Sequence, residues 1–175
     1  MPRFPRIPLG PILRLYANLP LGVLHRLGTV LGWVMYGMSP TYRRNLRANL
    51  ARAGYGDVRV RRAAIAHAGQ LLAEIPAVWL RPQERVAALV NEVHGVAAVD
   101  AARAAGKALL FLTPHMGCFE ITAQYAAQRM PLTVLYRPPK LIWLEPLMRS
   151  GRGRGGVRLA PADARGVREV LAALK

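Results

Sequence analysis

The chain has 175 residues, a length typical of a single domain with a buried core. It carries 25 lysine and arginine residues, 22 of them arginine, against 9 aspartate and glutamate residues, so its formal net charge is +16. Because 53% of the residues are hydrophobic, the chain is not a disordered basic tail. The single cysteine, Cys118, excludes an internal disulfide framework and a cysteine-rich zinc site. The charge predicts an anionic partner, and the apolar content favours a membrane surface over nucleic acid.

The first 40 residues form an apolar segment that we expect to associate with a membrane. Residues 1–11 contain four prolines and make a poor helix, whereas residues 12–38 are rich in leucine, valine and glycine. The longest uncharged run, residues 27–42, has 16 residues, fewer than the roughly 20 that span a bilayer. An interfacial helix, a short anchor with snorkelling arginines and an ordinary core helix all fit this pattern.

Residues 41–90 are expected to form a basic helical hairpin. Helices are predicted over residues 41–53 and 58–80, with a glycine-containing turn between them. The second helix directs four apolar side chains towards the core: Ile65, Leu72, Ile75 and Trp79. Seven arginines and one acidic residue occur between Arg43 and Arg62. This basic stretch is either a solvated face or a surface that contacts anionic headgroups.

From residue 91 onward, short apolar runs alternate with helical patterns, which predicts a largely parallel sheet flanked by helices. Strands are expected at residues 92–96, 108–112, 132–136 and 157–160. Helices are expected at residues 97–105, 121–130 and 141–149, and from about residue 162. Residues 108–112 have no polar break, so we expect this strand to be buried on both faces. The chain stops inside its last expected helix, so we expect a longer α/β domain that is incomplete at the C-terminus.

Two chemically versatile side chains, His115 and Glu120, follow the expected strand 108–112, at the corner where open α/β sheets bind ligands. On one continuous helix, five residues correspond to about 500° of rotation, so these side chains would point roughly 140° apart. They can meet only if the backbone turns between them, which Gly117 allows. An ionised glutamate could then hold one imidazole nitrogen as N–H and leave the other free to accept a proton.

A base oriented by a carboxylate beside guanidinium groups suits transfer to a hydroxyl of a phosphorylated acceptor. In this interpretation His115 deprotonates the hydroxyl, Glu120 orients and stabilises the imidazole, and arginines hold phosphate. The candidate arginines follow two expected elements further along the chain. Arg137 follows the strand 132–136, and Arg152 and Arg154 follow the helix 141–149.

Other kinds of site fit less well. No G-x-S-x-G elbow is present, and Cys118, the one possible thiol nucleophile, is better explained as a small filler beside the turn. His115 and Glu120 lack a third metal ligand, so we expect no metal. The remaining histidines occupy separate segments and are interpreted as structural or surface residues: His25, His67 and His94.

The arginine-glycine tract at residues 151–156 could instead bind RNA. It is short and has no aromatic platform on which bases could stack, so this interpretation is weak.

Three blocks, taken in order, resemble the lipid A biosynthesis (lauroyl/myristoyl) acyltransferase family of the lysophospholipid acyltransferase superfamily. Residues 115–120 match its His-x₄-Glu box, residues 136–138 match its Tyr-Arg-Pro block, and Gly151-Arg152 matches the arginine of its Arg-Gly-Arg block. The resemblance extends from about residue 12 to the end of the chain. Ser150 stands where many members have arginine, and members continue beyond the equivalent of Lys175 through an Asp-Gln segment.

The resemblance implies a glycerolipid-acyltransferase-like fold with three parts: a membrane-associated helix (1–40), a helical hairpin (41–90) and the N-terminal part of the α/β acyltransferase domain (91–175). It implies an enzyme on the cytoplasmic face of the inner membrane, held peripherally or by one N-terminal anchor. Such an enzyme transfers a fatty acyl chain from acyl carrier protein to a hydroxyl of a Kdo-bearing lipid A precursor, without a metal or organic cofactor.

By matching, His115 is the base, Glu120 its partner and Arg152 a contact to the substrate or transition state. Arg137 matches the family's pattern less closely. Arg137 and Arg154 are further candidates for substrate binding. The expected partners are acyl carrier protein, anionic membrane lipids and the lipid A precursor, with no nucleic acid.

Two alternatives remain. One is a glycerophospholipid or ornithine-lipid O-acyltransferase, in which the acid of the His-x₄-acid box is typically aspartate, so that Glu120 favours lipid A. The other is a non-enzymatic basic module that binds a membrane or nucleic acid.

Overall fold

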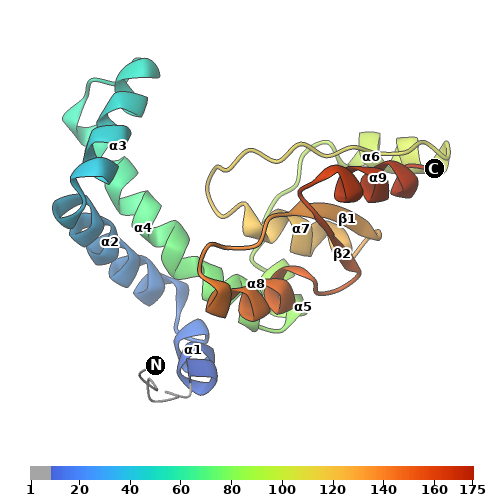
Figure 1. The fold of residues 1–175 in the computed structure, drawn as a ribbon, viewed down its shortest axis with the longest axis horizontal. Coiled ribbons are helices and arrows are strands. Elements are labelled where there is room, and N and C mark those ends of the chain that lie inside the picture. The colour runs from blue at the N-terminus through green and yellow to red at the C-terminus, as the bar shows by residue number, and fades with distance from the viewer. Residues whose placement is uncertain (1–8) are drawn as a thin grey trace. The chain divides into compact units, whose positions relative to one another are not determined.

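The computed structural model describes residues 9–175, so the first eight residues of the proline-rich start lie outside the described part. The fold is mixed α/β and mostly helical (Figure 1), and its described residues contain one two-stranded parallel sheet. The chain divides into two compact units, Met1–Ala77 and Val78–Lys175.

The first unit is built from helices α1 (Leu9–Ala17), α2 (Leu21–Met38), α3 (Pro40–Arg52) and most of α4 (Val58–Leu80). Residues 12–38 contain parts of two helices, α1 and α2, which are separate because Pro20 lacks an N–H and precedes the first residue of α2 in an extended conformation. Ser39 begins α3 by accepting a hydrogen bond from the backbone N–H of Tyr42 at 3.2 Å. The helices expected at 41–53 and 58–80 are confirmed.

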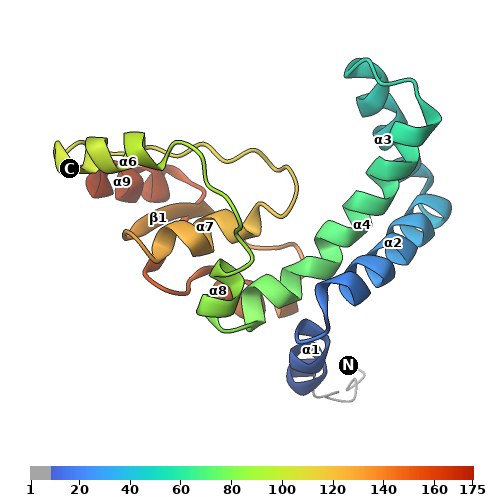
Figure 2. The same ribbon diagram turned by 180° about the vertical axis from the view of Figure 1, so that it is seen from behind.

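Helices α2 and α4 lie side by side in both face views (Figures 1 and 2) and pack at very short range. Gly28 and Gly32 of α2 face Gly69 of α4, where a Cβ on Gly69 would lie 2.7 Å from the Cα of Gly32. The side chains of Leu24 and Ile65 are fully buried here, whereas Leu72, expected in the core, is 41% exposed.

Helix α4 is long and apolar enough to cross a membrane by length and composition, and a third of its most apolar window is buried inside the protein. Helix α2 also exposes apolar side chains: Val23, Leu27, Val30, Leu31, Trp33, Val34 and Met38. Helix α3 contains no buried residue. The first unit therefore exposes both apolar and arginine side chains.

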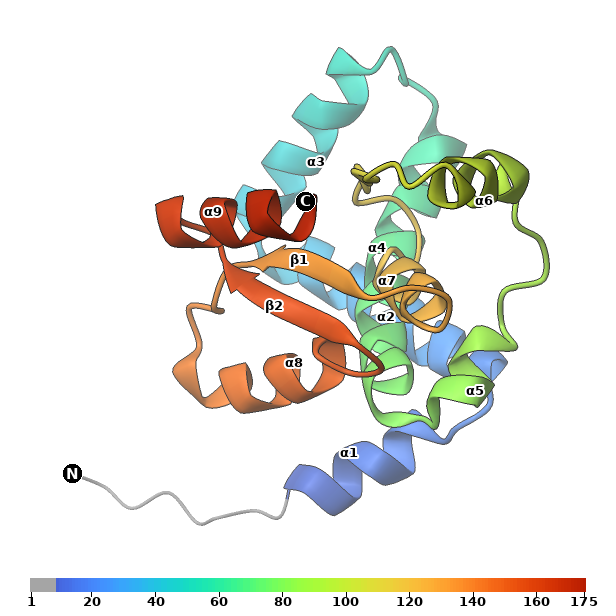
Figure 3. The same cartoon turned by 90° about the vertical axis from the view of Figure 1, so that its right-hand side faces the viewer.

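The second unit contains α5 (Gln83–Ala87), α6 (Val96–Ala104), α7 (Glu120–Ala127), α8 (Glu145–Arg152), α9 (Ala164–Ala173) and a short 3-10 helix, Ile142–Leu144. Its sheet pairs β1 (Leu132–Tyr136) in parallel with β2 (Val157–Pro161), in a register that sets Leu132 opposite Val157. Helix α9 packs on both strands (Figure 3), and Asp163 caps its first turn with hydrogen bonds of 2.8 and 3.0 Å. The strands expected at 132–136 and 157–160 are confirmed.

The other two expected strands are wrong: residues 92–96 and 108–112 are not strands in the described structure. Leu110 and Leu112 are 68% and 87% exposed, where burial on both faces was expected. An apolar run becomes a strand only when its N–H and C=O groups find a neighbouring strand. In the described residues β1 pairs with β2 alone, so residues 108–112 have no regular secondary structure.

Candidate functional site

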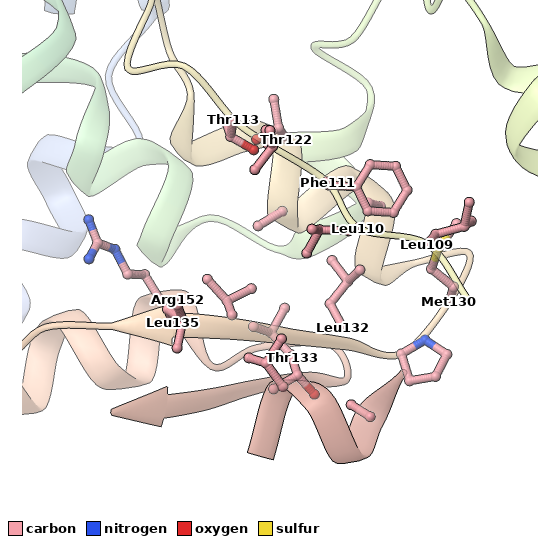
Figure 4. Close-up of a pocket in the computed structure, with 18 of the residues that line it drawn as sticks. Leu109, Leu110, Phe111, Thr113, Thr122, Met130, Leu132, Thr133, Leu135 and Arg152 are labelled. Atoms are coloured by element: carbon pink, nitrogen blue, oxygen red, sulfur yellow. The ribbon is translucent and has the colours of Figure 1, made fainter. Parts of the chain in front are cut away.

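A large cavity occupies the second unit and has a volume of about 1130 Å³. The segment 109–115 and helix α7 form one part of its lining, and β1 forms another. Leu109 and Leu110 lie across from Leu132 and Leu135 (Figure 4), and Arg152 lies near the Leu135 end. The cavity is therefore mainly apolar, with a small number of charged groups.

Glu120 is the most buried acidic side chain of the site, with 6% of the residue exposed. It is the first residue of α7, where the helix dipole favours a carboxylate. Its carboxylate accepts hydrogen bonds from Trp79 Nε1 at 3.0 Å and from Arg152 Nε, which lies 3.0 Å from each carboxylate oxygen. A second Arg152 nitrogen, Nη2, donates to Oε1. These donors compensate for the removal of the carboxylate from water.

The guanidinium of Arg152, the last residue of α8, lies near two aromatic rings. Its guanidinium carbon is 5.6 Å from the ring centre of Trp79 and 5.9 Å from that of Tyr136. At these distances each ring attracts the cation through its quadrupole. Arg152 is thus held by its ion pair with Glu120 and by its contacts with two aromatic rings.

His115 lines the same cavity as Glu120 and Arg152. It lies on the exposed loop before α7, and its ring centre is 4.4 Å from that of Phe119. Gly117 has a φ of +53°, so the predicted backbone turn between His115 and Glu120 is confirmed. Within residues 9–175, no hydrogen bond or ion pair joins His115 to Glu120, whose carboxylate bonds Trp79 and Arg152. The orienting role of Glu120 on His115 stays a prediction.

The other predicted candidates lie outside the cavity lining. Arg137 is exposed at the end of β1. Arg154 is half-buried, and its Nη1 donates to the backbone carbonyl of Trp79 near the end of α4. Burial lowers the pKa of Arg154, and the carboxylate of Glu84 opposes that shift. Cys118 is partly exposed beside the turn. Arg154 thus contacts protein backbone, whereas Arg152 reaches the cavity.

Tyr136 ends β1 and is 2% exposed, and its hydroxyl has no hydrogen-bond partner in the described structure. Burial raises the pKa of Tyr136 above its ordinary value of 10.0, and the carboxylate of Glu145 raises it further. The guanidinium groups of Arg152 and Arg149 act in the opposite direction. Tyr136 therefore stays neutral at physiological pH.

Two contributors to the site were not predicted as site residues, Trp79 and Gln124. Gln124 is 2% exposed and donates from Nε2 to the carbonyl of Gly151 at 3.0 Å, which ties α7 to the end of α8. Trp79 was expected only in the core. One feature of the sequence could have indicated its role. A tryptophan lies at the end of a long helix, and a buried tryptophan needs an acceptor for its N–H.

Chemically, the cavity combines an exposed imidazole with a buried carboxylate–guanidinium pair. The imidazole can exchange a proton with a ligand in the cavity, and a guanidinium can stabilise negative charge that develops there. Within residues 9–175, no group of three or more histidine, cysteine, aspartate or glutamate residues could hold a metal ion.

A comparison with curated proteins finds no match. A family model, bacterial lipid A biosynthesis acyltransferase, matches residues 10–175, which is almost the whole chain. The match covers most of the first unit, the whole second unit and every charged residue of the cavity. The chain therefore belongs to the bacterial lipid A biosynthesis acyltransferases, a family of enzymes that transfer acyl groups in lipid A synthesis.

Proposed function

We propose that this protein transfers a fatty acyl chain from the thioester of acyl carrier protein to a hydroxyl of a lipid A precursor. The observation that carries the proposal is that His115, Glu120 and Arg152 line one large, mainly apolar cavity. Family membership supports the reaction class. The apolar lining suits a hydrocarbon chain, and the charged residues supply the proton acceptor and the cation that acyl transfer requires.

In the proposed reaction, the imidazole of His115 removes the proton from the acceptor hydroxyl as its oxygen attacks the thioester carbonyl carbon. The negative charge that develops on the carbonyl oxygen is stabilised by the guanidinium of Arg152. The carbon–sulfur bond then breaks, and the imidazolium returns its proton to the departing thiolate. The products are the new ester and the free thiol of the carrier protein, so one proton and one acyl group are exchanged.

Glu120 has two roles in this proposal. It holds Arg152 through the hydrogen bonds from Nε and Nη2, and its negative charge stabilises the imidazolium that forms on His115. The second role requires the loop before α7 to bring the imidazole towards the carboxylate, and the positive φ of Gly117 makes this loop a sharp turn.

The first unit supports a membrane location for the reaction. Exposed apolar side chains on α2 and the arginines of α3 fit the boundary between acyl chains and anionic headgroups. We propose that the protein binds the cytoplasmic face of the inner membrane through this unit. There it would meet its lipid acceptor in the bilayer and acyl carrier protein in solution, without a metal or organic cofactor.

The proposed function is tested with purified protein, acyl-acyl carrier protein and a Kdo-bearing lipid A precursor in mixed micelles. His115→Ala and Glu120→Gln should each lower transfer by about 10²–10⁴-fold, the range for loss of a general base or its partner. His94→Ala is the matched control, because His94 pairs with Glu92 on the exposed surface and lies outside the cavity. Near-full transfer by either cavity variant would disprove the assigned mechanism.

The acceptor and donor are varied in the same assay. Transfer to lysophosphatidic acid or to an ornithine lipid in place of the lipid A precursor would support the glycerophospholipid or ornithine-lipid alternative. A wild-type protein that binds anionic vesicles but shows no turnover with any acyl thioester would support a non-enzymatic membrane module.

A further inference from the structure

Trp79 contacts four residues in or beside the site, and all four are distant from it in the sequence. It lies in the last turn of α4 and is 6% exposed. Its indole N–H donates to Glu120, its ring faces Arg152, its side chain packs on Gly151 and its carbonyl accepts a hydrogen bond from Arg154.

The contact with Glu120 is the chemically decisive one. The indole Nε1 lies 3.0 Å from Oε2, and both residues are buried. A carboxylate that is removed from water needs N–H donors in its place, and a hydrogen bond to a charged acceptor is about twice as strong as a neutral one. Trp79 donates from α4 and Arg152 donates from α8, so the carboxylate at the start of α7 is held by two other helices.

The side chain of Trp79 packs closely against the C-terminal end of α8. A Cβ at residue 151 would collide with the Cβ and Cγ of Trp79, so only glycine allows α8 to approach this closely. The carbonyl of Trp79 is bonded by Arg154, which follows α8 in the chain. Trp79 therefore contacts three residues of the stretch 151–154, the stretch that carries Arg152.

We propose that Trp79 is a positioning residue, which holds the carboxylate of Glu120 and the guanidinium of Arg152 in the geometry needed for acyl transfer. The inference rests on the proposed function, which it extends to a residue outside the three sequence blocks. Trp79 acts through Glu120 and Arg152, and removing its N–H alone should slow the reaction without weakening donor binding.

The test replaces Trp79 by benzothienylalanine, which keeps the bicyclic shape but has sulfur in place of the N–H group. Trp79→Phe is the genetically encoded counterpart. The expected result is a fall in kcat of about 10- to 100-fold, as for the loss of one hydrogen bond to a charged group. The KM for acyl-acyl carrier protein should stay within about twofold, because ground-state binding is not altered. Trp143→Phe is the matched control, since Trp143 is 65% exposed in the same unit.

A second measurement does not depend on the folding of any Trp79 variant. In ¹⁵N-labelled wild-type protein, the indole N–H resonance of Trp79 should lie downfield and should move upfield in Glu120→Gln, because a neutral amide is a weaker acceptor than a carboxylate. An unmoved resonance would overturn the inference. Equal kcat values for the wild type and the benzothienylalanine variant would also overturn it.

Different results would disprove the proposed acyl transfer and the positioning role of Trp79. Wild-type protein that shows no acyl transfer would disprove the proposed function, and the positioning role with it. Normal transfer by the wild type together with normal transfer by both Trp79 variants would disprove the positioning role alone.

Discussion

The Nε atom of Arg152 lies 3.0 Å from each carboxylate oxygen of Glu120, in an ion pair that joins the last residue of α8 to the first residue of α7. The glutamate side chain is 5% exposed and the arginine side chain is 28% exposed. The pair is thus largely removed from water, and the attraction between the two charges offsets part of the cost of burying them.

Removing the arginine should therefore destabilise the protein. In Arg152→Met the carboxylate of Glu120 stays buried without its cationic partner, and we expect a loss of about 3 kcal/mol, the lower end for a broken buried pair because Arg152 is partly exposed. Urea unfolding measures the loss. Arg165→Met is the control: Arg165 pairs with Glu169 at 3.4 Å on the surface, so its loss should cost within about 0.5 kcal/mol. Equal losses in the two variants would contradict this prediction.

A second pair, His25 and Glu74, joins α2 to α4 in the first unit. His25 Nε2 lies 2.5 Å from Glu74 Oε1, and the glutamate side chain is 15% exposed. Glu74→Gln keeps the shape but weakens the hydrogen bond, so we expect a loss of about 1–2 kcal/mol in unfolding free energy. Glu92→Gln serves as the control, because Glu92 and His94 form a similar pair at 3.2 Å with both side chains exposed. A Glu74→Gln protein as stable as the control would show that the interhelical pair contributes nothing.

Gly69 should not tolerate a side chain. A Cβ at this position would lie 2.7 Å from the Cα of Gly32 and would press on the backbone of Gly28. The atoms in the way belong to the backbone of α2, which cannot move aside as the end of a flexible side chain can. Gly69→Ala should therefore destabilise the protein by about 2–3 kcal/mol. Thermal unfolding checks the value. Gly22→Ala is the control, because a Cβ on Gly22 would meet no atom within 4 Å. This substitution should be neutral, or stabilising by up to about 1 kcal/mol through helix propensity.

The buried phenol of Tyr136 predicts a change in stability at high pH. Burial raises its pKa above 10.0, so the folded state binds the phenolic proton more tightly than the unfolded state. The stabilisation is complete below pH 10 and is lost as the pH rises from 10 through the folded-state pKa. Unfolding free energy should fall less steeply above pH 10 in Tyr136→Phe than in the wild type.

At neutral pH the same substitution should be neutral or slightly stabilising, because the Tyr136 hydroxyl is buried without a partner. Burial also raises the pKa values of Tyr16 and Tyr42, so the two proteins are compared at each pH to isolate Tyr136. Identical slopes above pH 10 would contradict the prediction.

Local sequence signals were sufficient for most of the helices and for the turn in the site. Ser39-Pro40 begins α3, and Gly106, with a φ of +66°, follows the end of α6. Gly117 adopts the positive φ expected between His115 and Glu120. These features depend on the allowed backbone angles and hydrogen-bonding capacity of neighbouring residues, so a short window of sequence contains the information.

Tertiary structure alone decided two other features. Residues 108–112 have the composition of a buried strand, but a strand forms only where another strand lies beside it, and none pairs with them in the described residues. The partners of Glu120 lie 41 and 32 residues away, at Trp79 and Arg152. The resemblance of residues 115–120 and 151–152 to family blocks identified Glu120 and Arg152 as candidates. The sequence predicted an interaction of Glu120 with the nearby His115 and not with Arg152. Packing brought the ends of α4 and α8 to the start of α7, because a buried carboxylate requires donors wherever in the chain they originate.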